Sequence, residues 1–169
     1  LLRMKGEQPT EIAGAAKLLR DKVTRVKTHE KKLVCDTCGT GGDYSGTFNI
    51  STCTAILGFS CGLTVAKHGN RSVTSRCGSA DVLEAVGYKI DLEPSKSEDL
   101  LNNCGFAFLF APLYHRAMKN VMPVRKELGF RTIFNIIGPL CNPAHSNIQI
   151  MGVNDYNLLK IIPPVFQAM

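Results

Sequence analysis

Two short stretches of the sequence have residue types that bind phosphate groups. The first, Gly39-Thr40-Gly41-Gly42-Asp43, holds three glycines in four positions. Glycine lets backbone N–H groups approach an anion closely. The spacing matches neither the P-loop nor the G-x-G-x-x-G motif, so on its own the stretch fits a tight turn equally well. Asn49, Ser51 and Thr52 follow at an expected helix start, where free N–H groups and the helix dipole favour a phosphate.

The second stretch, Lys67-His68-Gly69-Asn70-Arg71, directly follows an expected strand. Open α/β sheets bind ligands at the carboxyl ends of their strands. Lys67 offers a point charge and Arg71 a fork of donors for phosphate, although a solvated basic turn fits the same residues. His68 is expected to pack or to form a hydrogen bond rather than to catalyse. Two such loops after successive strands favour one phosphate site.

Hydrophobic periodicity and turn residues predict the elements that position these loops. The expected helices are residues 9–26, 51–61 and 79–86, and the expected strands are residues 33–35, 63–66, 88–92, 132–137 and 148–153. Ser95 to Glu98 predicts a capping box. Residues 98–129 predict a largely helical segment that is broken near Gly105 and Pro123.

These short strand–loop–helix units predict an α/β protein with a mostly parallel sheet and flanking helices, plus part of a small helical domain. The helical lobe is expected to consist of residues 1–28 and 95–129, and the α/β lobe of residues 30–94 and 130–169. The chain begins without an initiator methionine and stops inside an apolar run that has no helix cap. We therefore expect an internal fragment, truncated at both ends.

Composition places the chain among ordinary globular proteins. It has 169 residues, of which 44% are hydrophobic and 20% charged, and that length supports a core without disulfides or metals. No apolar run approaches the roughly 18 residues that cross a bilayer, and no signal peptide opens the chain. The net charge of +6 is scattered rather than gathered in the stripe typical of nucleic-acid binders. We expect a soluble, cytoplasmic protein that binds neither a membrane nor nucleic acid.

The seven cysteines are spread among apolar residues, which favours reduced, mostly buried thiols. Cys35 and Cys38 form a C-x-x-C pair. Because no second such pair and no histidine pair follows at zinc-finger spacing, we expect no zinc site from this motif.

Taken together and in order, the motifs resemble anthranilate phosphoribosyltransferases over essentially the whole chain. The segments that carry the likeness are residues 36–43, 48–52, 67–71, 78–84, 131–135, 138–140 and 142–143. The resemblance implies a nucleoside phosphorylase- and phosphoribosyltransferase-like fold. It also implies transfer of phosphoribose from phosphoribosyl pyrophosphate to anthranilate in tryptophan biosynthesis, with Mg²⁺ as cofactor and a homodimer as the full-length protein.

The resemblance further implies roles for individual residues. Those expected to bind phosphoribosyl pyrophosphate are Gly39, Gly42, Asp43, Asn49, Ser51, Thr52, Lys67, Asn70 and Ser79. Ser51 is also an expected Mg²⁺ ligand. Those expected to bind anthranilate are Asn70, His115, Arg125, Gly138 and Pro139. A guanidinium suits a carboxylate because it can pair bidentately, whereas from the residues alone Arg125 and His115 are surface groups of a helix. No catalytic residue is assigned.

The sequence departs from the family at several positions. Thr74, Arg76 and Cys77 stand where small serine-like residues are common, Cys53 where alanine is usual, and Arg116 where proline is common. The family's adjacent Asp-Glu pair, which holds magnesium, has no counterpart before Met169, so residues 1–169 alone are expected to be inactive.

Two alternatives stay open. A pyrimidine-nucleoside phosphorylase has the same fold, but its phosphate loop differs from residues 67–71. A non-enzymatic relative that binds nucleic acid through basic helices is disfavoured by the two intact phosphate loops and by the scattered charge.

Overall fold

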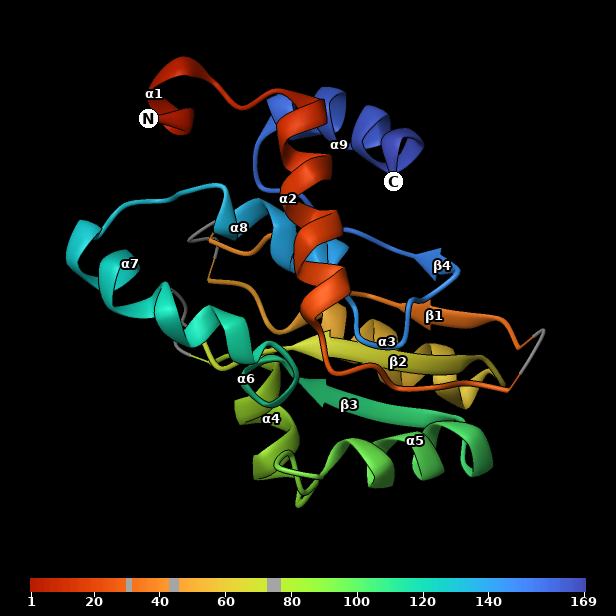
Figure 1. Cartoon of the computed structure of the whole chain (residues 1–169). Helices are drawn as coiled ribbons and strands as arrows, with labels where there is room; N and C mark the ends of the chain where they lie inside the picture. The colour runs from red at the N-terminus through yellow and green to blue at the C-terminus, as the bar shows by residue number, and fades with distance from the viewer. Residues whose placement is uncertain (30–31, 43–45, 73–76) are drawn as a thin grey trace.

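The computed structural model describes residues 1–29, 32–42, 46–72 and 77–169 (Figure 1). Asp43, Thr74 and Arg76 lie outside the described residues. Within them, four parallel strands form one sheet in the order β3-β2-β1-β4. The strands are β1 (Val34–Asp36), β2 (Thr64–Gly69), β3 (Phe106–Phe110) and β4 (Ile148–Gln149). The expected α/β class with a parallel sheet is confirmed.

The register of the sheet brings three strand ends to one edge. β2 pairs with β3 from Val65 opposite Phe106 to Gly69 opposite Phe110. On its other side β2 pairs with β1, where Cys35 lies opposite Val65. Because all strands run in the same direction, the segments that follow β1, β2 and β3 begin at the same edge, where open α/β sheets bind ligands.

Helices surround the sheet in the described part of the chain. They are α1 (Leu2–Lys5), α2 (Pro9–Lys22), α3 (Ile50–Ser60), α4 (Ser79–Ala85), α5 (Pro94–Asn103), α6 (Ala111–Tyr114), α7 (Met122–Leu128), α8 (Phe134–Ile137) and α9 (Tyr156–Ala168), with short 3₁₀ turns η1 (Arg116–Asn120) and η2 (Gly138–Leu140). In Figure 1 the upper part of α2 lies beside α9 above the sheet, and α1 stands apart from them near the N-terminus. The predicted helices at 51–61 and 79–86 are confirmed as α3 and α4, and the one at 9–26 is confirmed as α2 up to Lys22, after which Val23 is extended.

Two apolar clusters hold these layers together. In one, the valines that follow α2 pack on the sheet, on α5 and on Tyr114. In the other, Ile12, Ala13 and Ala16 of α2 pack against the α8–η2 segment and Val165 of α9. The segment 131–141 is thereby fixed between α2 and the sheet, beside the carboxyl edge of the strands.

Strand β3 lies inside the segment that the sequence predicts to be helical, so that prediction is wrong at 106–110. An unbroken apolar run of five residues has neither a helical nor a strand period, and such runs are typical of parallel strands buried on both faces. The predicted strand 88–92 is also wrong. Tyr88 instead lies beside β3, where its hydroxyl accepts a hydrogen bond from the Phe108 N–H at 3.0 Å. The lobe boundaries stay a prediction, although segment 95–129 supplies β3 to the sheet.

Two further local predictions are wrong because side chains form other hydrogen bonds than the sequence pattern indicated. Residues 132–137 contain helix α8 rather than a strand, because the Asn135 side chain accepts from the Thr132 N–H at 2.9 Å and starts a helical turn. The Ser95–Glu98 capping box does not form. The Glu98 carboxylate instead accepts from the Lys27 N–H at 2.9 Å, which fixes the chain after α2 against α5.

None of the seven cysteines forms a disulfide, but the expectation of mostly buried thiols is wrong. Cys35 and Cys141 are buried and Cys38 is half-buried, while Cys53, Cys61, Cys77 and Cys104 are exposed. No helix among the described residues is long and apolar enough to cross a membrane.

Candidate active site

Lys67 lies on β2 rather than in a loop, because the strand continues to Gly69. Its side chain is 1% exposed, and its Nζ lies 3.5 Å from the hydroxyl oxygens of both Thr37 and Ser51. Burial lowers the pKa of this ammonium. Among the described residues Lys67 forms no ion pair with a carboxylate. A buried cation of this kind favours the binding of an anion.

Asp36, the last residue of β1, is fully buried beside Lys67. Its Oδ1 accepts from the His68 N–H at 3.1 Å, while its Oδ2 has no hydrogen-bond partner among the described residues. Burial raises the pKa of this carboxyl to about 6, and the Asn142 amide and the Lys67 ammonium partly oppose the shift. The sequence did not indicate a site role for Asp36, since one acidic residue at a strand end has no distinctive spacing.

Ser51 and Thr52 lie in the first turn of α3, as predicted. The Thr37 hydroxyl donates to the Ser51 carbonyl at 2.7 Å and so ties the segment after β1 to this helix start. Asn49 is the N-cap residue of α3, and no side-chain cap hydrogen bond is found at this helix start among the described residues. Thr52 is buried and its hydroxyl has no partner among the described residues. The structure thus brings Ser51 close to Lys67, as expected if the two stretches form one phosphate site.

The glycine loop packs against the chain that follows β4. A Cβ at position 39 would lie 2.8 Å from the Gly152 carbonyl oxygen, so only glycine fits there. The Thr40 N–H donates to the same carbonyl at 2.9 Å. Gly41 and Gly42 have φ of 61° and 71°, a backbone conformation that favours glycine.

Two side chains, those of Arg131 and Asn154, form hydrogen bonds to the loop, and neither was predicted to be a site residue. Arg131 Nη1 donates to the Gly42 carbonyl at 3.2 Å and Nη2 to the Gly41 carbonyl at 3.4 Å. Asn154 Nδ2 donates to the Gly42 carbonyl at 3.1 Å. Both side chains therefore fix the loop carbonyls. The only sequence signal for Arg131 was its membership of the family-like 131–135 motif, which carried no assigned role.

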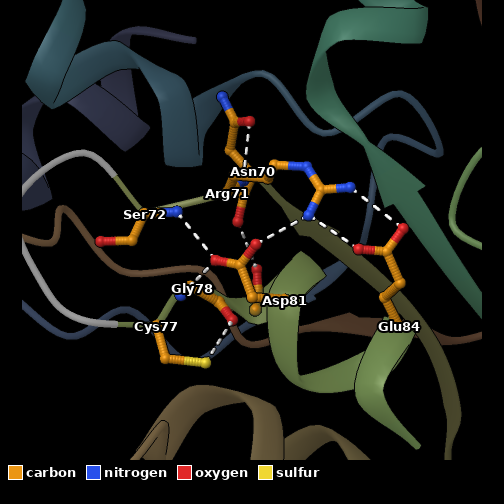
Figure 2. A network of polar contacts seen from close by, with 8 residues as sticks. Asn70, Arg71, Ser72, Cys77, Gly78, Asp81 and Glu84 are labelled. Carbon is orange, nitrogen blue, oxygen red and sulfur yellow. Dashed lines mark hydrogen bonds and ion pairs between the residues drawn. The ribbon is translucent and has the colours of Figure 1, made fainter.

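The loop after β2 returns tightly onto the start of α4 (Figure 2). The Asn70 carbonyl accepts from the Ser79 hydroxyl at 3.2 Å and from the Ala80 N–H at 3.3 Å. A Cβ at Gly69 would collide with Ser79 Oγ and with the Phe108 ring. Asn70 and Ser79, both predicted to bind phosphoribosyl pyrophosphate, are thus placed side by side.

The contacts of Arg71 differ from those expected of the phosphate ligand that its charge suggested. Its Nη1 lies 2.8 Å from Asp81 Oδ1 and 2.8 Å from Glu84 Oε2, and its Nη2 donates to Glu84 Oε1 at 3.0 Å (Figure 2). Glu84 and then Asp81 raise the pKa of Arg71. The guanidinium therefore fastens the loop after β2 to α4.

His115 is buried and pairs with His68. Their Nε2 atoms lie 3.1 Å apart, and the two rings are inclined at 50°. Burial lowers the pKa of both imidazoles, that of His68 to about 3 with the nearby His115 and Lys67 adding to the effect. Both rings are therefore neutral, and one donates to the other. The reading of His115 as a surface histidine is wrong, and the expectation that His68 packs and forms a hydrogen bond is confirmed.

Gly138 and Pro139 lie in η2, directly after α8. Pro139 is buried, and its carbonyl accepts from Gln149 Nε2 of β4 at 2.7 Å. The Gly138 carbonyl lies near enough to the His68 ring to counter part of the fall in its pKa. These two residues are therefore held beside the histidine pair by the sheet and by the α2 cluster.

Arg125 lines a cavity of about 620 Å³ on the outer side of this segment. Its guanidinium lies 5.7 Å from the centre of the Phe134 ring, and Nη1 lies 3.7 Å from Met122 Sδ. Partial burial lowers the pKa of Arg125. The lining residues are Lys119, Met122, Pro123, Arg125, Lys126, Gly129, Phe130, Arg131 and Asn135. Four of these are basic and none is acidic, which favours an anionic aromatic or aliphatic ligand.

Arg131 connects the two parts of the site, since it lines this cavity and also holds the glycine loop. A candidate phosphate-binding site therefore lies around Lys67, Ser51 and the glycine loop, and a cationic cavity lies beside it. No hydrogen bond among the described residues joins Arg125 to the histidine pair.

A parallel sheet that has a glycine loop and a buried lysine at its carboxyl edge, beside an adjoining helical segment, defines a ligand-binding class of α/β protein. The chain belongs to the glycosyl transferase family, whose α/β-domain model matches residues 31–169.

Within that family the similarity is to anthranilate phosphoribosyltransferases. The curated protein from Pelodictyon phaeoclathratiforme is 56% identical over 165 residues, which cover 98% of this chain and 46% of that protein. The one from Persephonella marina is 51% identical over 168 residues, covering 99% and 50%. The resemblance seen in the sequence motifs is confirmed.

Solved structures agree. The anthranilate phosphoribosyltransferase of Thermus thermophilus superposes with a TM-score of 0.93 at 42% identity, covering 98% of this chain and 50% of that one. The Saccharomyces cerevisiae enzyme in complex with phosphoribosyl pyrophosphate and Mg gives 0.90 at 34% identity, covering 99% and 47%. The chain thus spans about half the length of the relatives it matches.

Proposed function

We propose that the full-length protein transfers phosphoribose from phosphoribosyl pyrophosphate to the amine of anthranilate, giving phosphoribosyl-anthranilate and pyrophosphate in tryptophan biosynthesis. The observation that carries this proposal is the buried Lys67 ammonium, 3.5 Å from the Ser51 and Thr37 hydroxyls at the carboxyl edge of the sheet. Relatives that are 51% and 56% identical are named for this activity.

In this proposal the phosphates of the donor bind between the glycine loop, the start of α3 and the end of β2. Lys67 supplies the charge, and the backbone N–H groups of the loop supply further donors. The remaining donor-binding residues are Gly39, Gly42, Asp43, Asn49, Thr52, Asn70 and Ser79. Negative charge develops on the leaving pyrophosphate, so donors that are already fixed in place stabilise the transition state without reorganising.

Mg²⁺ fits this site as the cofactor. The ion usually takes one or two protein oxygens and completes its shell with substrate phosphates and waters. Ser51 Oγ is a half-buried oxygen that faces the same space as Lys67 Nζ, so it suits such a ligand. When bound, Mg²⁺ neutralises charge on the pyrophosphate group.

Anthranilate is assigned to the side of the site formed by Asn70, His115, Arg125, Gly138 and Pro139. The cavity beside Arg125 is cationic and lined by Phe130 and Met122, which suits an aromatic ring that bears a carboxylate. An aromatic amine is a weak nucleophile, so the contribution of these residues is to position it. We assign no general base, because the two buried histidines are neutral and occupied with each other.

Four wider assignments belong to the same proposal. The full-length protein is a homodimer that works in the cytoplasm. It is built from a helical lobe (1–28 and 95–129) and an α/β lobe (30–94 and 130–169), and it binds its small-molecule substrates without nucleic acid or membrane.

The test is turnover by the full-length protein. Anthranilate fluorescence should fall only when phosphoribosyl pyrophosphate and Mg²⁺ are both present. Absence of turnover, or release of base from pyrimidine nucleosides in phosphate buffer instead, would overturn the assignment. The second result would support the nucleoside phosphorylase alternative.

A further inference from the structure

Three side chains with metal-ligand atoms meet below the glycine loop. They are Asp36 at the end of β1, Cys38 two residues later and His68 on β2, and one ligand atom of each lies within 4.8 Å of the others. Asp36 and His68 are buried and Cys38 is half-buried. The set does not use Cys35, so it is not the C-x-x-C motif that the sequence argued against.

Two atoms of this cluster are left without partners. Asp36 Oδ2 and His68 Nδ1 are both buried and lack a hydrogen-bond partner among the described residues. The other atoms of the same side chains are satisfied, since Asp36 Oδ1 accepts from the His68 N–H and His68 Nε2 meets His115. Buried polar atoms are normally paired, and an unpaired carboxylate oxygen and imidazole nitrogen in one place call for a common partner.

We propose that Asp36, Cys38 and His68 form a binding site for a divalent transition metal of the Zn²⁺ class. Carboxylate oxygen, thiolate sulfur and imidazole nitrogen together select such an ion over Mg²⁺, which takes oxygen ligands. This site is separate from the Mg²⁺ position assigned to Ser51, and it stands or falls independently of the proposed function.

The chemistry of the three groups allows binding. In the tautomer whose proton is on Nε2 and is donated to His115, the Nδ1 lone pair of His68 is free to coordinate. The Cys38 thiol binds a metal as the thiolate, so its proton passes to water as the sulfur–metal bond forms. Three protein ligands leave one of the four positions of a tetrahedral ion for water.

Bound metal would connect the first residues of the glycine loop to β2. Cys38 immediately precedes Gly39, whose position is limited by the Gly152 carbonyl. A metal bond to Cys38 therefore stabilises the entry of the loop, whereas Arg131 holds the carbonyls of Gly41 and Gly42.

The test is titration of the metal-free full-length protein with Co²⁺, which reports thiolate ligation by a near-ultraviolet charge-transfer band. We expect a saturable band at one ion per chain. One equivalent of Zn²⁺ removes it, while excess Mg²⁺ does not. Cys38→Ser should lose the band and bind Co²⁺ at least about tenfold more weakly. Cys53→Ser, which removes an exposed cysteine of α3, should keep both.

A second variant tests the proposal if Cys38→Ser does not fold. If circular dichroism shows that Cys38→Ser is unfolded, His68→Gln should instead retain the charge-transfer band and change the visible d–d bands. Absence of the band in the wild type, or its persistence in folded Cys38→Ser, overturns the proposal. In that event Asp36 Oδ2 is satisfied by a proton.

Discussion

Arg131 Nη1 donates a hydrogen bond to the Gly42 carbonyl at 3.2 Å, across 89 residues of chain. Arg131→Ala removes this bond and the one to Gly41, and it frees the loop to sample conformations that do not bind phosphate. Hydrogen bonds of this kind contribute about 1–2 kcal/mol, so we expect the KM for phosphoribosyl pyrophosphate to rise roughly 5- to 30-fold. Steady-state kinetics of the full-length protein measure it.

Lys126→Ala is the matched control for Arg131. Lys126 lines the same cavity, but no hydrogen bond from it to the glycine loop is found among the described residues. The KM of Lys126→Ala for phosphoribosyl pyrophosphate should stay within about twofold of the wild-type value, as is usual when a solvated charge is removed. An equal rise in both variants would mean that the general charge of the cavity, not the loop contact, attracts the donor.

Lys67→Met should separate function from stability. The substitution removes a buried ammonium while keeping much of the side-chain volume. A charged hydrogen bond to phosphate is worth about 1.5–3 kcal/mol, so affinity for phosphoribosyl pyrophosphate should fall roughly 10- to 100-fold. The free energy of unfolding of the ligand-free protein should rise, because a desolvated charge without an ion-pair partner is costly. Calorimetric binding and chemical denaturation give the two values, and unchanged affinity removes Lys67 from the site.

Arg125 has a distinct role in the proposal. Arg125→Ala should raise the KM for anthranilate at least about tenfold and leave that for phosphoribosyl pyrophosphate nearly unchanged, because a guanidinium pairs with a carboxylate through two parallel bonds. Arg125→Lys should recover little, since an ammonium lacks that planar fork. Equal increases for both substrates would indicate instead that Arg125 supports α7 through Phe134 and Met122.

Local sequence signals predicted most of the elements that carry the phosphate site. Pro9 opens α2, and Gly62 ends α3 with a φ of 91°, because these residues have strong conformational preferences of their own. The position of Lys67 after an apolar strand was sufficient to place it at the sheet edge. What the residues alone could not give was the identity of the family, which came from the motifs in combination.

The predictions that failed concern residues whose structure depends on partners that are distant in the sequence. Residues 106–110 became a strand because β2 offers them a full-length parallel neighbour. Arg71 became a link to α4 because Asp81 and Glu84 lie within its reach after folding. Arg131 and Asn154 entered the site from far along the chain, since 89 and 112 residues separate them from Gly42. No spacing rule along the chain reports such contacts.

Asp81 provides a test of the loop after β2. Its Oδ2 accepts from the Gly78 N–H at 2.7 Å and from the Ser72 N–H at 3.3 Å (Figure 2). Asp81→Ala should destabilise the protein by about 1 kcal/mol, as does loss of other side chains that cap a helix start. Arg71→Ala should leave affinity for phosphoribosyl pyrophosphate within about threefold of wild type, because exposed ion pairs contribute little. A large loss of affinity would restore Arg71 as a phosphate ligand.

The pH dependence of the Asp81 effect follows from its pKa. The Gly78 N–H lowers the pKa of Asp81 in the folded protein, burial opposes it with the second-largest effect, and Arg71 and the Ser72 N–H add smaller lowering effects. A carboxyl with a depressed folded pKa contributes its full stabilisation above its unfolded pKa of about 3.9 and loses it as the pH falls through the folded value. The difference in unfolding free energy between wild type and Asp81→Ala should therefore be constant from about pH 7 to about pH 5 and shrink below about pH 4. Denaturation curves at these pH values measure it. A difference that grows on acidification would mean that the protonated carboxyl, not the carboxylate, holds the loop.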